Sequence, residues 1–231
     1  MKTNFDDLYQ LFAELDMAEA SYLVLRGYED LFDKQRFTGE HRDIDILCAD
    51  AIAVRDAIGA IPNRRKEDFT HYHVFVGGER VNLDLRHLGD GYYCDSWEKQ
   101  MLSGRRRWGC LYAMSAEDYF YSLAYHAVIQ KKVLAEDYRV VLSDMAKDLS
   151  IPLKGVREAD FISALEQYMR NQGFSYTYTA DPSIPLRFSL VSSDMIVPDY
   201  RRRFRRGVFQ VTHRIQTIGS KIKRLFSHES A

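Results

Sequence analysis

Two short stretches of the sequence place aspartates at alternate positions among apolar residues. The first reads Asp43-Ile44-Asp45-Ile46, and the second reads Val81-Asn82-Leu83-Asp84-Leu85. Residues two apart in a β-strand point to the same side, so Asp43 and Asp45 face one way while the isoleucines face a core. Asp84 also stands opposite leucines within its strand, where an unpartnered aspartate is costly. The pattern predicts two half-buried strands that carry three carboxylates.

Carboxylates held side by side repel each other, and a fold tolerates them when a cation neutralises the pair. Mg²⁺ prefers hard oxygen ligands and is usually bound by one or two carboxylates together with phosphate oxygens of a substrate. Asp43, Asp45 and Asp84 are therefore the candidate ligands of a Mg²⁺ (or Mn²⁺) ion and the candidate catalytic residues. The alternative is a solvated strand end, since a D-x-D tripeptide is frequent by chance.

The surrounding periodicity predicts a mixed α/β (α+β) fold with a small sheet, flanking helices and a helical C-terminal half. Ser115 has the sequence context of a helix N-cap, and Gly77-Gly78 has that of a hairpin turn. Residues 174–198 contain three prolines and read as strand-like loops. The predicted elements are a helix over 4–17, strands over 22–25 and 44–48, a helix over 49–61, a hairpin over 71–86, and helices over 119–131, 134–149 and 158–171.

These elements divide the chain into three parts. We expect an α/β domain over residues 1–112, a helical domain over 113–199, and a basic amphipathic tail helix within residues 200–231. The order of elements in the first part is helix, strand, loop, strand, helix and hairpin, which is typical of an α/β module.

Three segments together resemble the signature elements of the nucleotidyltransferase superfamily, which has a polymerase-beta-like fold. They are Leu23-Val24-Leu25-Arg26-Gly27, Asp43-Ile44-Asp45-Ile46-Leu47 and Leu83-Asp84-Leu85. The resemblance covers about residues 22–86, and the helices after Ser115 are similar to the helical half that such enzymes append.

The resemblance implies a role for each matching position. Gly27 corresponds to the turn that binds the donor phosphates, Asp43 and Asp45 to the metal ligands, and Asp84 to the third carboxylate, which activates the acceptor hydroxyl. Arg26 and Arg42 lie beside these motifs and are candidates for binding the donor phosphates. The alternative for each arginine is a solvated charge at a strand end.

The implied activity is a Mg²⁺-dependent transfer of a nucleotidyl or phospho group. The chain is similar to bacterial proteins of surface-polysaccharide assembly and to fukutin-like and phosphocholine-transferase-like phosphotransferases. This likeness implies a nucleotide or CDP-linked donor and a glycan or lipid-linked acceptor. A second interpretation is a catalytically inactive binding or regulatory module tethered to the membrane. Tyr28 after Gly27, where the family usually has a second small residue, favours that module, whereas the complete aspartate set favours the enzyme.

Histidines and aromatic residues near the motifs have two interpretations each. His71 and His73 share one face of a predicted strand, and we favour surface or substrate contacts over metal binding because no third ligand has matching spacing. The aromatic run from Tyr92 to Trp97 forms either the floor of a ligand cleft or packing within a loop, and we favour packing. His126 is either a donor-phosphate contact or a hydrogen-bonded core residue, and we favour the core.

The tail separates charge from the rest of the chain. Residues 200–226 contain nine of the 32 Lys and Arg residues and no Asp or Glu, so residues 1–199 hold 23 basic and 32 acidic groups. Apolar residues recur every three or four positions along the tail, as expected for one helical stripe. The stripe consists of Phe204, Val208, Val211, Ile215, Ile218, Ile222 and Leu225.

A basic helix with one apolar stripe is typical of a segment that lies in a membrane interface. We therefore expect residues 200–226 to bind an anionic membrane surface. The alternatives are packing on the acidic body, a coiled coil, and nucleic acid, which we do not expect because the tail has no RNA-binding motif.

The start of the sequence has no basic segment followed by an apolar segment, so we expect no secretory signal. The three cysteines are odd in number and form no CxxC, which favours a reducing compartment. The expected location is cytoplasmic, peripheral at the inner face of the cell membrane.

Overall fold

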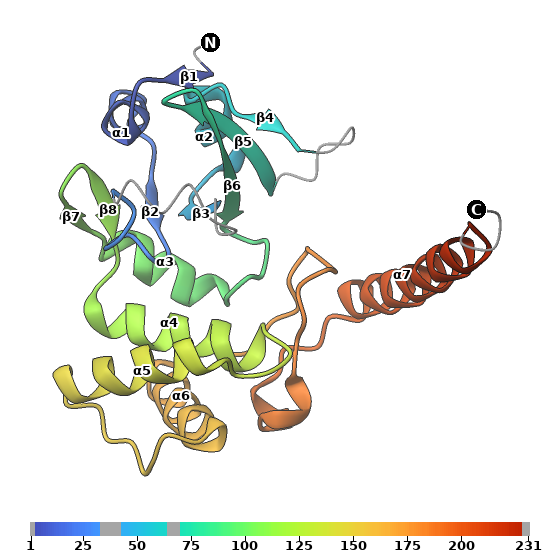
Figure 1. The fold of residues 1–231 in the computed structure, drawn as a ribbon. Coiled ribbons are helices and arrows are strands. Elements are labelled where there is room, and N and C mark those ends of the chain that lie inside the picture. Colours follow the sequence, from blue (N-terminus) through green and yellow to red (C-terminus); the bar gives the residue numbers. More distant parts are fainter. Residues whose placement is uncertain (1–2, 33–42, 64–69, 228–231) are drawn as a thin grey trace.

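The structure is a computed structural model that describes residues 3–32, 43–63 and 70–227. Its elements, in chain order, are β1 (Asn4–Phe5), α1 (Leu8–Met17), β2 (Tyr22–Val24), β3 (Asp43–Cys48), α2 (Ala51–Ala57), β4 (Ile61–Pro62), β5 (His71–Val76), β6 (Glu79–His87), α3 (Asp95–Ser103), β7 (Arg106–Trp108), β8 (Leu111–Ala113), α4 (Ala116–Ile129), α5 (Glu136–Asp148), α6 (Glu158–Gln172) and α7 (Tyr200–Ser227). Single 3₁₀ turns lie at Phe188–Leu190 and Ser193–Met195. The predicted mixed α/β fold is confirmed (Figure 1).

The strands form one mixed sheet in the order β1-β5-β6-β3-β2-β8-β7, and β4 pairs with β5 beside that path. The central pair, β3 and β6, is parallel, whereas β2 pairs with β3 and β5 pairs with β6 in antiparallel fashion. The β5–β6 hairpin turns at Gly77-Gly78, where both residues have positive φ (58° and 81°). Positive φ at both central positions matches the twist of a two-residue hairpin, which explains the glycine pair.

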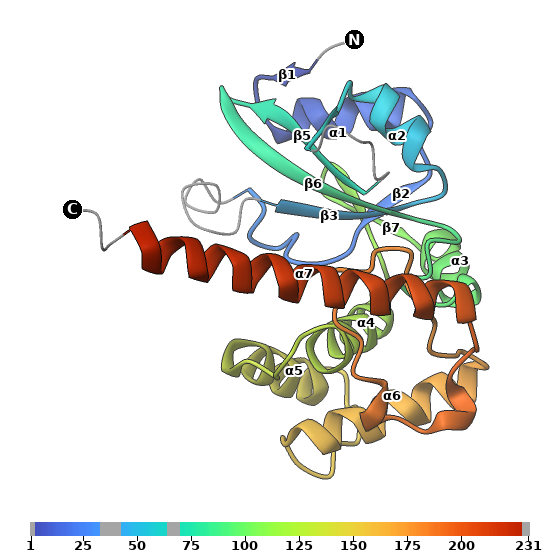
Figure 2. The ribbon, with the colours of Figure 1, turned by 90° about the vertical axis from the view of Figure 1, so that its right-hand side faces the viewer.

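The sheet lies between two groups of helices. Figures 1 and 2 both show α1 and α2 on one side of the sheet and α4, α5 and α6 on the other. Ile44, Ile46, Leu83 and Leu85 are at most 1% exposed, as the alternation predicted for the core-facing side of β3 and β6. The opposite side of the same strands carries the polar residues and is turned toward the helical half.

Two predicted helix boundaries are wrong by four residues, one because of strand pairing and one because of a turn. The first helix begins at Leu8 because Asn4 and Phe5 pair with β5, and the Asp7 side chain accepts the N–H of Gln10 as an N-cap. The second helix ends at Ala57 because the chain turns at Gly59, which has a φ of +55°, and then forms β4 on the edge of the sheet.

The helical half packs around α4. Ser115 is the predicted N-cap, and its Oγ accepts the N–H of Asp118 at 3.1 Å. Every residue of α4 from Asp118 to Ile129 is buried, because the helix lies between the sheet and the outer helices. The boundary predicted at residue 112 falls inside β8, which joins the sheet beside β2 through Ala113.

The aromatic run packs in the interior, as favoured from the sequence. Tyr92, Tyr93 and Trp97 are at most 1% exposed. The Trp97 ring stacks on Phe174 with 5.3 Å between centroids, and its indole N–H donates to Asp118 at 3.0 Å. These residues therefore join α3 to α4 and to the segment after α6 rather than lining an open cleft.

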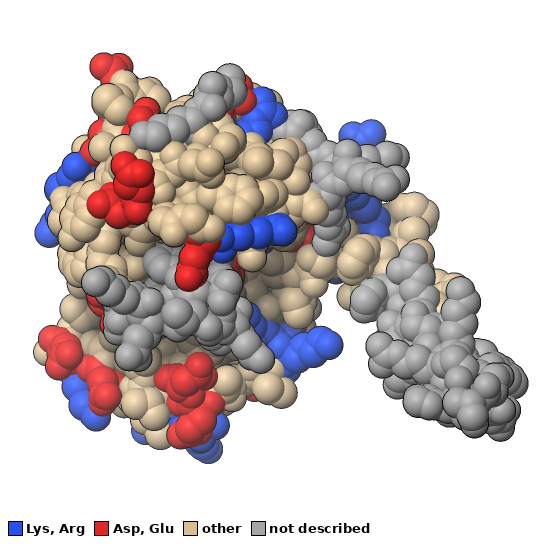
Figure 3. Space-filling model, turned by 45° about the horizontal axis from the view of Figure 1, so that its top comes forward, with Lys and Arg blue, Asp and Glu red and all other residues tan. Residues whose placement is uncertain are grey.

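The last element, α7, is the basic helix that the sequence predicted, and it projects from the body (Figure 1). Within the described residues, no helix combines the length and apolar character needed to cross a bilayer. On the face of the body seen in Figure 3, the acidic and basic side chains drawn in red and blue are interspersed and do not form one large patch of either sign.

Candidate functional site

The sheet register brings the predicted aspartates together. Asp45 of β3 is the direct partner of Asp84 of β6, and Asp43 is the partner of Asn82. Adjacent strands lie about 4.8 Å apart, and paired residues project to the same side. Asp84 is in turn paired with His71 of β5. Asp43, Asp45, Asp84 and His71 therefore form one polar cluster on the side of the sheet that is turned toward the helical half.

Arg26, just after β2, is the cationic partner of Asp45. Its Nε lies 2.9 Å from Asp45 Oδ2, and its Nη2 donates to the Tyr92 hydroxyl at 2.9 Å. Burial disfavours the charged form, but Asp45 and Tyr92 outweigh it and hold the pKa of Arg26 well above its ordinary value. With its side chain 14% exposed, Arg26 is a largely buried counterion of Asp45 and not a solvated strand-end charge.

A second arginine, Arg86, neutralises Asp84 from two residues further along β6. Its side chain is 2% exposed, lies 3.3 Å from Asp84 Oδ2 and 3.5 Å from Asp181 Oδ2, and stacks 4.5 Å from the centre of the Tyr92 ring. Asp181 comes from the long segment between α6 and α7. Burial raises the pKa of Asp181, but hydrogen bonds from Ser183 and the charge of Arg86 more than offset this and keep it below its ordinary value.

Arg86 and Asp181 are the charged neighbours of the cluster that the sequence did not predict. Arg86 had a usable signal, because it follows Asp84 at strand spacing and therefore shares its face. Asp181 had none, since its contact with Arg86 depends on a loop that returns to the sheet from the helical half.

The two arginines do not fully compensate the carboxylates. Burial and the charge of Asp45 raise the pKa of Asp84, and this effect exceeds the opposing effect of Arg86 and His71. Asp43 is exposed and has no ion-pair partner among the described residues. The cluster therefore retains an electrostatic preference for additional positive charge.

His126 takes the core position favoured from the sequence, whereas the surface or substrate contacts of His71 and His73 stay predictions. His71 Nε2 lies 3.9 Å from Asp84 Oδ1 and 3.7 Å from Asp181 Oδ2, so it borders the cluster without a short ion pair to either. His73 lies further along β5, with its Nδ1 2.7 Å from Asn63 Oδ1. His126 is buried 3.1 Å from the Tyr92 hydroxyl, and burial followed by the charge of Arg26 lowers its pKa well below the ordinary value. It is a neutral core residue.

The glycine turn after β2 is held by the helical half. Gly27 has a φ of +63°, and its N–H donates to the Tyr119 hydroxyl of α4 at 3.2 Å. Tyr28 is 7% exposed and packs against Tyr119 and Trp108, so its side chain lies in the core. Residues 27–32 are not helical. Arg42, the other predicted phosphate contact, lies outside the described residues.

The chemistry of the donors suits a hard divalent cation, but the present arrangement pairs them with arginines. Across residues 3–32, 43–63 and 70–227, no three His, Cys, Asp or Glu side chains are arranged as a metal-ligand set. Asp45 is turned to Arg26 and Asp84 to Arg86, and these guanidinium groups are the cations with which a metal ion would compete.

Neither a protein-family model nor a curated protein matches this sequence. Any functional assignment therefore depends on the motif and on the geometry of the cluster.

Proposed function

We propose that this chain is a Mg²⁺-dependent (or Mn²⁺-dependent) nucleotidyl- or phospho-group transferase. Its donor is a nucleotide or a CDP-linked alcohol, and its acceptor is a glycan or lipid-linked molecule of cell-surface polysaccharide assembly at the inner face of the membrane. The observation that carries the proposal is the register of β3 and β6, which pairs Asp45 with Asp84 and leaves Asp43 two residues away on the same face.

The electrostatics of the cluster support a cation. Three carboxylates lie on one face, and burial, followed by the charge of Asp45, raises the pKa of Asp84 against the opposing effect of Arg86 and His71. A bound Mg²⁺ would neutralise donor phosphate oxygens as negative charge develops during the transfer. Asp43 and Asp45 are the residues that would hold it, with Asp84 as the third carboxylate.

The cationic and basic residues of the site have roles that follow from their contacts. Arg26 now binds Asp45, so a cation on that carboxylate would release the guanidinium for a donor phosphate, to which it can bond in bidentate geometry. Asp84 lies beside Asp45 on the same face, where it would accept the proton of the attacking hydroxyl as a general base.

The test is metal-dependent nucleotide binding. The thermal midpoint of the wild-type protein is measured with nucleoside triphosphates and with CDP-choline and CDP-glycerol, each with and without Mg²⁺. We expect at least one donor to raise the midpoint only when Mg²⁺ is present. Asp45→Asn should abolish this rise while keeping a hydrogen-bond acceptor for Arg26. The matched control is Asp144→Asn, because Asp144 is an exposed partner of Lys147 on α5.

The second candidate is a binding or regulatory module without catalysis. The ion pairs Arg26–Asp45 and Arg86–Asp84 favour it, because they balance much of the charge without a metal. The bond from Gly27 to Tyr119 also favours it, since that N–H is already used. A protein that binds no donor in either metal condition, and whose Asp45→Asn variant behaves like the wild type, would favour the module and refute the transferase.

A further inference from the structure

The first turns of α7 are fixed to the body by two arginines on one side of the helix. Arg202 donates to the carbonyls of Tyr178 and Gly89 at 2.8 and 2.7 Å. Arg206 is 7% exposed and donates to the carbonyls of Asp181, Pro182 and Ile184. The residues that attach α7 are thus polar, and they bind the segment between α6 and α7 and the loop after β6.

The opposite side of α7 is apolar and open. With about 3.6 residues per turn, positions 200, 204, 208, 211 and 215 form one stripe that lies roughly opposite Arg202 and Arg206. The exposed fractions along the stripe are 79% for Tyr200, 75% for Phe204, 50% for Val208, 59% for Val211 and 65% for Ile215.

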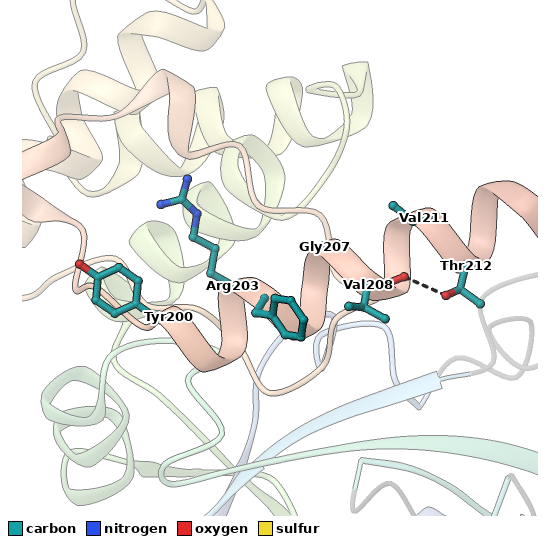
Figure 4. A pocket seen from close by; sticks show the side chains of 7 residues that line it. Tyr200, Arg203, Gly207, Val208, Val211 and Thr212 are labelled. Atoms are coloured by element: carbon teal, nitrogen blue, oxygen red, sulfur yellow. Dashed lines mark hydrogen bonds between the residues drawn. The ribbon is translucent and has the colours of Figure 1, made fainter.

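The stripe forms a shallow groove that no other described element covers. Every residue that lines the groove belongs to α7, between Tyr200 and Thr212 (Figure 4). The Thr212 hydroxyl bonds back to the carbonyl of Val208 at 2.9 Å, so it presents its methyl group and little free polarity. An exposed apolar face of this length is unusual for a surface without a partner.

Basic residues flank the stripe. Arg201, Arg203 and Arg205 are exposed, and they lie on both sides of the apolar positions. No Asp or Glu occurs anywhere in residues 200–226. The partner must therefore accept apolar side chains at its centre and offer negative charge at both margins.

An anionic bilayer fits these requirements better than the other occupants. The body does not use the stripe, because it binds the arginine side of α7. Two copies of α7 side by side would place basic flanks against basic flanks, with no acidic residues to pair them. Nucleic acid offers phosphates but no apolar phase for the central stripe, whereas a lipid interface offers both.

We propose that α7 is an interfacial helix that docks the protein on an anionic lipid surface, with the stripe from Tyr200 to Ile215 among the acyl chains and the flanking arginines at the headgroups. Docking in this orientation leaves Arg202 and Arg206 facing away from the membrane, where they hold the body.

This orientation has a consequence that depends on the proposed transferase. Arg206 binds the carbonyl of Asp181, and the Asp181 carboxylate lies beside Arg86 and His71 at the cluster. The cluster then lies on the far side of α7 from the lipid, separated by at least one helix diameter, roughly 10–12 Å. A lipid-linked acceptor is the substrate class that reaches a site at this height. The docking itself does not depend on the transferase.

The experiment is vesicle flotation of the full chain. Vesicles of phosphatidylcholine alone are compared with vesicles that contain about one third phosphatidylglycerol. We expect the wild type to float with the anionic vesicles and to be released by high salt. Val208→Glu should reduce the partition coefficient by about tenfold or more. The variant loses a valine that docking would bury among the acyl chains, and it brings a negative charge to negatively charged headgroups.

The control for Val208→Glu is Val140→Glu. Val140 is the same residue type on α5 and has nearly the same exposed fraction, 52% against 50%. Val140→Glu should float like the wild type. Arg201→Gln and Arg205→Gln should each weaken binding by about fivefold, since a charge near an anionic surface contributes about 1 kcal/mol.

Three outcomes would overturn the docking proposal. The first is a wild type that floats with neither vesicle. The second is equal flotation of Val208→Glu and Val140→Glu, with unchanged circular dichroism. The third is a dimer in sedimentation equilibrium that Val208→Glu dissociates while no flotation occurs, which would identify a second copy as the occupant. Loss of the Mg²⁺-dependent donor binding with intact flotation would refute only the transferase.

Discussion

Replacing Arg26 with leucine removes the cation that neutralises Asp45. The guanidinium and the carboxylate are 14% and 13% exposed, so the pair is largely buried. Removing one member of a buried pair costs about 3–5 kcal/mol, because the other charge remains without compensation. Because both side chains keep some exposure, we expect Arg26→Leu to cost a free energy of unfolding near the lower end of that range, at about 3 kcal/mol. For a chain of this size, each kcal/mol lowers the thermal midpoint by about 2–4 °C, so we expect a fall of roughly 6–12 °C.

The same variant should bind a divalent cation more tightly than the wild type. In the wild type a metal must displace Arg26 from Asp45, whereas in Arg26→Leu the carboxylate is free for it. A ligand at about a hundred times its Kd stabilises the folded state by about 2.7 kcal/mol. Saturating Mg²⁺ should therefore restore roughly 5–11 °C of the midpoint in the variant, and a smaller amount in the wild type.

The measurement is differential scanning calorimetry with a Mg²⁺ titration against a choline chloride titration of equal ionic strength. The control is Arg107→Leu, which breaks a 2.7 Å ion pair with Asp16 away from the cluster and should show no Mg²⁺ response. If Mg²⁺ leaves the midpoint of Arg26→Leu unchanged, or raises that of Arg107→Leu equally, the cluster is not a divalent-cation site. If Arg26→Leu is as stable as the wild type, the Arg26–Asp45 ion pair does not contribute the stability expected of it.

Three further predictions concern stability and order. Burial and the charge of Asp90 raise the pKa of Glu98 from 4.5 to about 8, so the folded state favours the neutral acid. The free energy of unfolding should therefore fall as pH rises from about 4.5 to 8. Urea denaturation should show this fall in the wild type and a smaller one in Glu98→Gln. Arg206→Ala should increase cleavage of the segment around Asp181 by proteinase K, mapped by mass spectrometry, because three carbonyls lose their donor; unchanged cleavage would contradict an anchoring role. Trp97→Ala should cost about 3–5 kcal/mol in urea denaturation, because the fully buried ring is removed, and a cost below about 1 kcal/mol would be incompatible with the packing described above.

Local pattern was sufficient to predict the elements that hold the candidate site. The alternation in β3 and β6 predicted which side of each strand faces the core, because side-chain direction in a strand has a period of two residues. The same rule placed Asp43 and Asp45 together, and it would have added Arg86 to the face of Asp84. The apolar stripe of α7 could likewise be predicted, because helical spacing alone defines it.

Contacts between segments that are remote in the sequence could not be predicted from local pattern. That Asp45 lies beside Asp84 depends on the register between β3 and β6, which are separated by a helix, two strands and residues 64–69. The contact of Asp181 with Arg86, and that of Gly27 with Tyr119, depend on how the helical half folds back onto the sheet.

The sequence alone thus determined the strand faces, the three aspartates and the two-sided tail helix, because these follow from periodicity along one segment. Only the tertiary structure decided that Arg26 and Arg86 are the counterions of the carboxylates, and that α7 attaches by Arg202 and Arg206 and leaves its stripe open. The physical reason is that ion pairing and burial depend on distances between segments remote in sequence, which no local pattern specifies.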